Sequence, residues 1–220
     1  MATHRYRLVI GNKNWSSWSL RPWLAMRKIG LEFEEINVQL RQPDTKAEIL
    51  KFSPSGMVPL LIDGDFQVWD SLAILEYLAD AYPEKGLWPA DREARALARC
   101  AAAEMHSGFM PLRRTCSMEI LARNPLDPVP EDVETDVRRI VALWRECRTR
   151  HGKDGPFLFG AFTAADAMYA PVASRFRTYL PDLARFGDDG TAAAYVETIF
   201  AMPELGAWIE GARAQVAAAP

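Results

Sequence analysis

Three serines lie where a polar loop runs into a helix, and their hydroxyls could act on a bound sulfur atom. Ser16, Ser17 and Ser19 precede apolar residues that have helical spacing. A free thiol has a pKa of about 8.5 and is mostly protonated at neutral pH, whereas the thiolate is the effective nucleophile. A hydroxyl that donates to sulfur beside a helix N-terminus stabilises the thiolate. We therefore expect this junction to activate a bound thiol.

A second group of residues could hold a carboxylate and an extended peptide. Asp70 and Ser71 precede apolar residues with helical spacing, so they mark a helix start, whose free N–H groups stabilise an anion. Val58 and Pro59 begin a short apolar run. If the bond between them is cis, the peptide groups of Val58 are free to pair with an extended ligand. The two pairs together predict a site for a peptide that carries a carboxylate.

Alternating strands and helices would position these residues. The hydrophobic period predicts two helices and two strands before a hairpin, and one helix after it; the ranges are strand 6–11, helix 17–29, strand 36–40, helix 44–51, hairpin strands 59–62 and 66–69, and a helix from 71. Asp63 and Gly64 mark the hairpin turn. Tyr6, in the first strand, is expected to pack in the core. The order β-α-β-α-β-β-α, with Pro59, predicts an α/β thioredoxin-like domain with its first strands parallel and its hairpin antiparallel.

Prolines and glycines punctuate residues 83–91, and helical patterns dominate the rest. This pattern predicts a thioredoxin-like domain over 1–83, a linker over 84–91 and an all-α helical-bundle domain over 92–220. The predicted helices of the second domain are 92–123, 131–151, 164–179, 191–201 and a short one near 203–212. Thr163 and Asp166 form a capping box, with Asp in place of Glu, at the start of the third.

The hairpin with Val58-Pro59 and Asp70-Ser71 resembles the glutathione-binding half of the cytosolic glutathione transferases. The succession of an α/β domain and a helical domain is also similar to that family, so the resemblance covers essentially the whole chain. It implies that Val58 and a cis Pro59 pair with the cysteinyl part of glutathione. It also implies that Asp70 and Ser71 hold the γ-glutamyl group, and that the chain forms a homodimer.

The serine loop resembles that of the serine-type transferases, particularly the zeta class, which reads Ser-Ser-Cys-Ser followed by an Arg two places on. This alignment implies that Ser16 activates the thiol and that Ser17 binds glutathione, while Ser17 and Ser19 remain alternatives as activators or helix caps. Trp18 stands where the zeta class has Cys, which leaves zeta-type isomerase chemistry open. No cysteine precedes Cys100, which argues against the cysteine-type classes and a redox thioredoxin.

A second-substrate pocket is expected along the first helix after the linker, lined by His106, Phe109 and Arg113, with Met105, Met110 and Arg114 beside them. A stripe of Met and aromatic residues at this spacing is also typical of a helix core, so a packing role is the alternative. Further along, Arg175 and Arg177 lie near the place where zeta enzymes carry an Arg for the substrate carboxylate, although Arg175 is three positions away from it.

Composition argues against several classes of protein. The 220 residues are 49% hydrophobic and carry a net charge of −3, which argues against nucleic acid or an anionic membrane as the main partner. No run approaches the roughly 18 apolar residues of a membrane span. No signal-peptide core precedes the first strand pattern, and three widely spaced cysteines make no disulfide framework, so a cytoplasmic protein is expected. His4, His106 and His151 are too scattered to suggest a metal site.

We therefore expect a glutathione transferase, with glutathione as co-substrate and no metal. It would ionise the thiol of glutathione for attack on, or isomerisation of, a small electrophile. The alternative is a glutathione-binding module of the same fold without turnover, acting as a carrier or a protein-interaction domain. No motif in the expected pocket identifies the electrophile.

Overall fold

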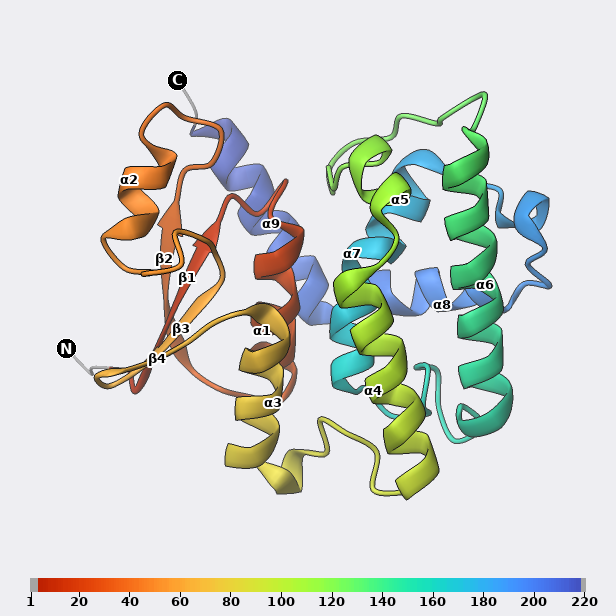
Figure 1. Cartoon of the computed structure of the whole chain (residues 1–220), viewed down its shortest axis with the longest axis horizontal. Coiled ribbons are helices and arrows are strands. Elements are labelled where there is room, and N and C mark those ends of the chain that lie inside the picture. The colour runs from red at the N-terminus through yellow and green to blue at the C-terminus, as the bar shows by residue number, and fades with distance from the viewer. Residues whose placement is uncertain (1–3, 219–220) are drawn as a thin grey trace.

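A four-stranded sheet with its covering helices forms one half of the molecule, and helices alone form the other (Figure 1). The computed structural model describes residues 4–218, so residues 1–3 and 219–220 of the predicted domains lie outside the described part. The strands are β1 (Tyr6–Gly11), β2 (Phe33–Val38), β3 (Leu60–Asp63) and β4 (Phe66–Val68). The helices are α1 (Ser17–Lys28), α2 (Thr45–Leu50), α3 (Ser71–Ala81), α4 (Arg92–Ser107), α5 (Met110–Thr115), α6 (Glu131–His151), α7 (Ala164–Tyr179), α8 (Thr191–Phe200) and α9 (Pro203–Ala217), with 3-10 turns η1 (Pro83–Lys85) and η2 (Leu183–Phe186).

The sheet has the predicted thioredoxin-like topology. Its strand order is β2-β1-β3-β4, with β1 and β2 parallel and the other neighbours antiparallel. Successive side chains of β1 point to opposite faces. Val9 packs with Ile49 of α2 on one face, whereas Leu8 and Ile10 pack in the core formed with α1 and α3 on the other. Tyr6 is buried as expected, and its hydroxyl contacts that of Tyr82.

Two boundaries in the sheet differ from the sequence prediction. The second strand was expected at 36–40, but β2 covers Phe33–Val38 because it pairs along the whole of β1, from Tyr6 opposite Phe33 to Gly11 opposite Val38. In the hairpin, Asp63 pairs with Phe66, so the turn consists of Gly64 and Asp65 rather than Asp63 and Gly64. Gly64 has φ of 60°, a conformation that glycine adopts without strain.

The prediction of one helix over 92–123 is wrong, because α4 ends at Ser107 and a second, short helix follows. Phe109 adopts a left-handed conformation with φ of 59°, and the short α5 begins at the next residue. Arg113 of α5 folds back and donates to the carbonyls of Met105, His106 and Gly108, which satisfies the end of α4. The last helix is also longer than predicted, since α9 runs to Ala217 rather than ending near 212.

Helix α7 lies at the centre of the helical half, and its predicted capping box is present. The backbone N–H of Thr163 donates to Asp166 Oδ2 at 2.7 Å. Asp166 Oδ1 also accepts from the Tyr195 hydroxyl at 2.9 Å, which ties α7 to α8. The domain boundary predicted at 84–91 stays a prediction. α9 belongs to the predicted second domain, yet it packs against α1 of the sheet half (Figure 1). Across residues 4–218, no helix has the length and apolar character that crossing a membrane requires.

Candidate active site

Ser16 lies directly before the first residue of α1, as the sequence predicts, and its side chain is nearly buried. The Ser16 hydroxyl donates to Ser19 Oγ at 2.7 Å, and Ser19 Oγ also accepts from the backbone N–H of Gly11 at 3.1 Å. The serine hydroxyl is therefore engaged within the loop. Because a hydroxyl can rotate about its C–O bond, Ser16 could exchange Ser19 for another acceptor.

Ser17 is joined to the helical half by Arg175 of α7. Arg175 donates to Ser17 Oγ at 3.3 Å and to the carbonyls of Cys116 at 2.9 Å and Pro171 at 3.1 Å. Arg177, the other arginine considered on this helix, lies over the ring of Phe200 at 4.2 Å and does not line this site. The structure therefore brings Arg175, and not Arg177, to the serine loop.

The start of α3 has the form of an anion site. Asp70 Oδ1 accepts from the backbone N–H groups of Leu72 at 3.0 Å and Ala73 at 3.3 Å, and thus caps the helix. Asp70 Oδ2 pairs with His106 Nε2 at 2.9 Å. Ser71 is fully buried, and within residues 4–218 its hydroxyl has no hydrogen-bond partner. An unpartnered buried hydroxyl at a helix N-terminus is a group that a bound carboxylate would satisfy.

Val58 and Pro59 precede β3, and the bond between them is cis, as the family resemblance implies. In the described part of the chain, the backbone N–H and C=O of Val58 form no hydrogen bond with the protein. Free peptide groups beside a sheet strand are the form in which proteins bind extended peptides. This arrangement is the one that the predicted pairing site requires.

A cavity of about 330 Å³ opens between the serine loop and helices α5 and α7. Four arginines line it: Arg41, Arg113, Arg114 and Arg175. The other lining residues are aromatic, sulfur-containing or hydroxyl side chains, namely Trp15, Trp18, Met110, Met118, Ser17 and Ser117. Among residues 4–218 no carboxylate lines the cavity, so the positive charge of this wall is not balanced from within it.

Arg21, the arginine that ends the serine-loop motif, adds a further cation to which sequence reasoning gave no role. Its side chain is fully buried in α1, lies 4.1 Å from the ring centre of Trp18, and has no hydrogen-bond partner among the described residues. Burial, with the nearby charges of Arg113 and Arg175, lowers the pKa of Arg21 well below its usual range. Burial likewise lowers the pKa of Arg175 to about 10. A charged residue within the apolar face of α1 was the available sequence signal.

The residues predicted for the second-substrate pocket separate into two groups. Arg113, Met110 and Arg114 line the cavity. Phe109 and Met105 do not, because both are buried in the hydrophobic core, which is the position that the packing alternative expects. His106 also lies outside the cavity wall, but it pairs with Asp70 and its ring packs against that of Trp18 at 5.4 Å. His106 thus links the start of α3 to the arginine-lined cavity.

A larger groove of about 760 Å³ lies elsewhere, between the end of α3, the start of α4 and the end of α6. It contains none of the residues predicted for the site. Its cations are accompanied by carboxylates, since Asp80, Asp91 and Asp154 also line it. The arginine-lined cavity is therefore the better candidate, because its charges are unbalanced and it touches the serine loop.

Comparison with known proteins identifies the family. Residues 15–81 match the model of the glutathione S-transferase N-terminal domain, and residues 130–214 match the model of the C-terminal domain. A glutathione S-transferase from Triticum aestivum is 37% identical over 181 residues, which cover 79% of this chain and 83% of the relative. The chain therefore belongs to the glutathione S-transferase family.

Other relatives refine the comparison. A zeta-class glutathione S-transferase from Euphorbia esula is 36% identical over 118 residues, so this match spans about half of each protein, 52% of this chain and 52% of the relative. The crystal structure of a glutathione transferase homolog from Burkholderia GL BGR1, with bound glutathione, is 25% identical. Its TM-score is 0.71, and the alignment covers 94% of this chain and 98% of that one.

Proposed function

We propose that this protein is a glutathione transferase that ionises the thiol of glutathione and presents it to a small electrophile. The observation that carries the proposal is the start of α3, where the buried hydroxyl of Ser71 lacks a partner beside the exposed carboxylate of Asp70. The α-carboxylate of the γ-glutamyl group would accept from the Ser71 hydroxyl and from the backbone N–H of Ser71, because the N–H groups of Leu72 and Ala73 already donate to Asp70. The peptide groups of Val58 would pair with the cysteinyl residue.

Calorimetry with glutathione tests this placement. Asp70→Ala and Ser71→Ala should each weaken binding by about 1–3 kcal/mol, the usual effect of losing a hydrogen bond to a charged group. Glu48→Ala is a matched control, because Glu48 is an exposed carboxylate of α2 that pairs with Lys51. Unchanged affinity in both site variants would contradict the placement.

The arginine-lined cavity supports an electrophile that carries one or more carboxylates. A ligand anion would be stabilised by the guanidinium groups of the wall, because no carboxylate among the lining residues balances their charge and guanidinium groups form bidentate contacts with carboxylates. Arg175 would lie between this anion and Ser17. Either addition to such an acid or its isomerisation is compatible with this arrangement. A panel of electrophiles matched in reactivity but differing in charge tests it, since the neutral members should react more slowly than the acids.

Ser16 is proposed as the residue that lowers the pKa of the bound thiol. Its hydroxyl would have to leave Ser19 and donate to the sulfur. An ultraviolet titration of the bound thiolate tests this role: Ser16→Ala should raise the thiol pKa and lower turnover at neutral pH, while Ser17→Ala should do less. Equal and negligible shifts would assign the activation to the N-terminus of α1 and its backbone amides.

The contact between Ser16 and Ser19 also favours a second function, a glutathione-binding module without turnover. In that case Ser16 only caps the loop, and its hydroxyl stays on Ser19. Glutathione would bind, but its thiol would keep a pKa of about 8.5 in the complex. The same titration therefore separates the transferase from the carrier or interaction module.

A cytoplasmic homodimer is proposed from the family and from an exposed apolar surface near α3. Met57, Phe66 and Trp69 are 68%, 59% and 48% exposed, although large apolar side chains are usually covered. A second copy of the chain would cover them. Light scattering tests this: Phe66→Glu should move the mass toward a single chain of 24.7 kDa, whereas Leu50→Glu, on the exposed side of α2, should not. A wild-type mass of one chain would refute the dimer.

A further inference from the structure

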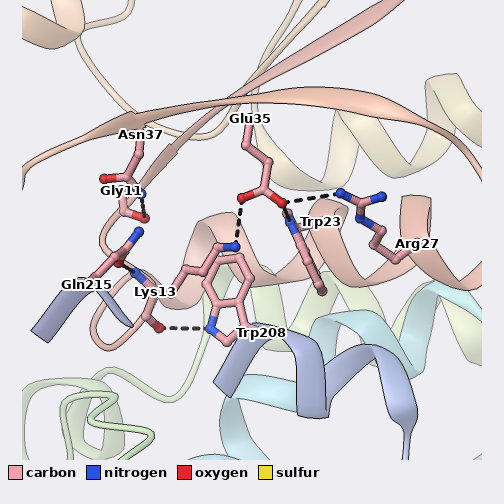
Figure 2. A network of polar contacts seen from close by, with 8 residues as sticks. All are labelled: Gly11, Lys13, Trp23, Arg27, Glu35, Asn37, Trp208 and Gln215. Carbon is pink, nitrogen blue, oxygen red and sulfur yellow. Dashed lines mark hydrogen bonds and ion pairs between the residues drawn. The ribbon is translucent and has the colours of Figure 1, made fainter. Parts of the chain in front are cut away.

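Helix α9 is hydrogen-bonded to the loop that carries the candidate catalytic serines, although the bonded residues are 195 and 202 positions apart in the sequence. The backbone N–H of Lys13 donates to Gln215 Oε1 at 2.8 Å, and the carbonyl of Lys13 accepts from Trp208 Nε1, also at 2.8 Å (Figure 2). Both peptide groups of one loop residue are thus bonded to side chains of α9. At the other end of α9, Glu204 pairs with Lys28 of α1 at 3.4 Å.

The side chain of Lys13 is built into the same contact. Its ammonium group lies 5.1 and 5.4 Å from the ring centres of Trp23 and Trp208 and pairs with Glu35 Oε2 at 2.7 Å (Figure 2). Cations are attracted to aromatic faces, most strongly to that of Trp. α9 leaves room for this side chain at Gly211, where a Cβ atom would come within 2.8 Å of the lysine Cδ. The fit between the loop and α9 is therefore specific to these residues.

A displacement of the Lys13 backbone would be transmitted to the serines through its neighbours Asn12 and Asn14. The carbonyl of Asn12 accepts from the backbone N–H of Ser16 at 2.8 Å, and the Asn12 side chain accepts from the backbone N–H of Leu40 at 2.6 Å. The carbonyl of Asn14 accepts from the N–H of Ile120 at 3.2 Å. The loop before α1 is thus fixed on either side of Lys13, and α9 fixes it at Lys13 itself.

We propose that α9 is a clamp that positions the serine loop for thiol activation, and that Gln215 and Trp208 are its positioning residues. This inference rests on the proposed transferase function. Neither side chain needs to touch glutathione. They act by holding the Lys13 peptide, and with it the direction in which the Ser16 hydroxyl and the first N–H groups of α1 point. Placement of this kind matters, because a displacement of about 1 Å can cost about 100-fold in rate.

The test compares Gln215→Leu, Gln215→Glu and Glu210→Gln in the full chain. Gln215 is half-buried on the surface of α9, so Gln215→Leu removes the acceptor of the Lys13 N–H without opening the core. Gln215→Glu keeps an acceptor and serves as the rescue variant. Glu210→Gln changes an exposed residue of α9 that pairs with Arg213 and does not contact the loop. Trp208→Phe removes the donor to the Lys13 carbonyl together with part of a buried indole ring, so it is a second variant whose unfolding midpoint is measured as well.

Two measurements decide the outcome. Hydrogen exchange of the amides of residues 12–16 reports the clamp without any ligand, and we expect faster exchange in Gln215→Leu but not in the rescue or control variants. The pKa of the bound glutathione thiol, with turnover, reports its effect on the site. We expect the pKa to rise and kcat to fall by about tenfold or more in Gln215→Leu, with little change in the unfolding midpoint.

The outcomes separate the clamp from the proposed function. Unchanged loop exchange in both Gln215→Leu and Trp208→Phe overturns the clamp. Faster exchange with an unchanged thiol pKa and kcat reduces α9 to a structural support and overturns its positioning role. A wild-type protein that fails to bind glutathione contradicts the transferase proposal, while the exchange of the loop amides still decides whether α9 holds the loop.

Discussion

Replacement of Arg21 by Met should make the protein more stable and should weaken anion binding at the arginine-lined cavity. The guanidinium of Arg21 is fully buried and unpartnered among the described residues, with Arg113 and Arg175 close enough to oppose its charge. An unpaired buried ion costs several kcal/mol in lost hydration. The cation–π contact with Trp18, at 4.1 Å from the ring centre, offsets about 2 kcal/mol of this lost hydration energy. Met has a similar length and no charge, so we expect Arg21→Met to raise the free energy of unfolding by about 1–4 kcal/mol.

Thermal unfolding with and without a small dicarboxylate measures both effects. For a chain of this size, each kcal/mol should raise the unfolding midpoint by about 2–4 °C. Succinate, bound by the arginine-lined cavity, should raise the midpoint of the wild type by mass action and raise that of Arg21→Met by less, because Arg21 adds its charge from behind the four arginines of the wall. Arg21→Lys keeps a cation and should retain part of the succinate effect. Arg177→Met is the matched control, because it also removes an arginine from an aromatic face, but away from the cavity.

Two results would refute this reasoning. A lower midpoint for Arg21→Met than for the wild type would mean that the contact with Trp18 outweighs the burial of the charge. A succinate effect of the same size in Arg21→Met and in the wild type would mean that Arg21 contributes nothing to anion binding. Either result would return Arg21 to a purely structural role in α1.

Three further predictions follow from contacts described above. Burial tends to raise the pKa of Glu35, but hydrogen bonds led by that from Lys13 hold the pKa below its usual value. The stabilisation from these bonds is therefore present above about pH 4.5 and is lost as the pH falls further. Glu35→Gln should reduce this loss of stability at acid pH, as measured by unfolding midpoints against pH. Thr163→Ala should lower the free energy of unfolding in urea by about 1 kcal/mol through loss of the capping box. His106→Asn should free the carboxylate of Asp70 for the ammonium group of glutathione and tighten binding in calorimetry; an unchanged Kd would speak against that competition.

Local chemistry explains which parts of the fold could be predicted from the sequence. The hairpin and the start of α3 follow from residues whose preferences act within a few positions, such as Gly64 at positive φ and Asp70 as a helix cap. The break between α4 and α5 could not be predicted in this way. It is made by Phe109 at positive φ, a conformation that its residue type does not favour, and by Arg113 folding back across α4.

The same difference between local preferences and three-dimensional contacts decides which residues of the candidate site could be predicted. Ser16, Asp70 and Ser71 could be proposed from the sequence because each lies at a helix start, which the sequence indicates and the structure shows. Arg21 and the α9 contacts of Lys13 were not found, because both depend on what surrounds a side chain in three dimensions. A periodic pattern indicates which face of α1 is buried, but it does not indicate that a cation within that face lacks a partner.

The bond between Trp208 and the carbonyl of Lys13 joins residues 195 positions apart, and this separation has a consequence for synthesis on the ribosome. At about 5–20 residues per second, the loop emerges roughly 10–40 s before the helix that holds it. The sheet and α1 can assemble during this interval, but the peptide groups of Lys13 must wait for their partners. A nascent chain would therefore form its sheet and α1 before the proposed contact between α9 and the serine loop can form.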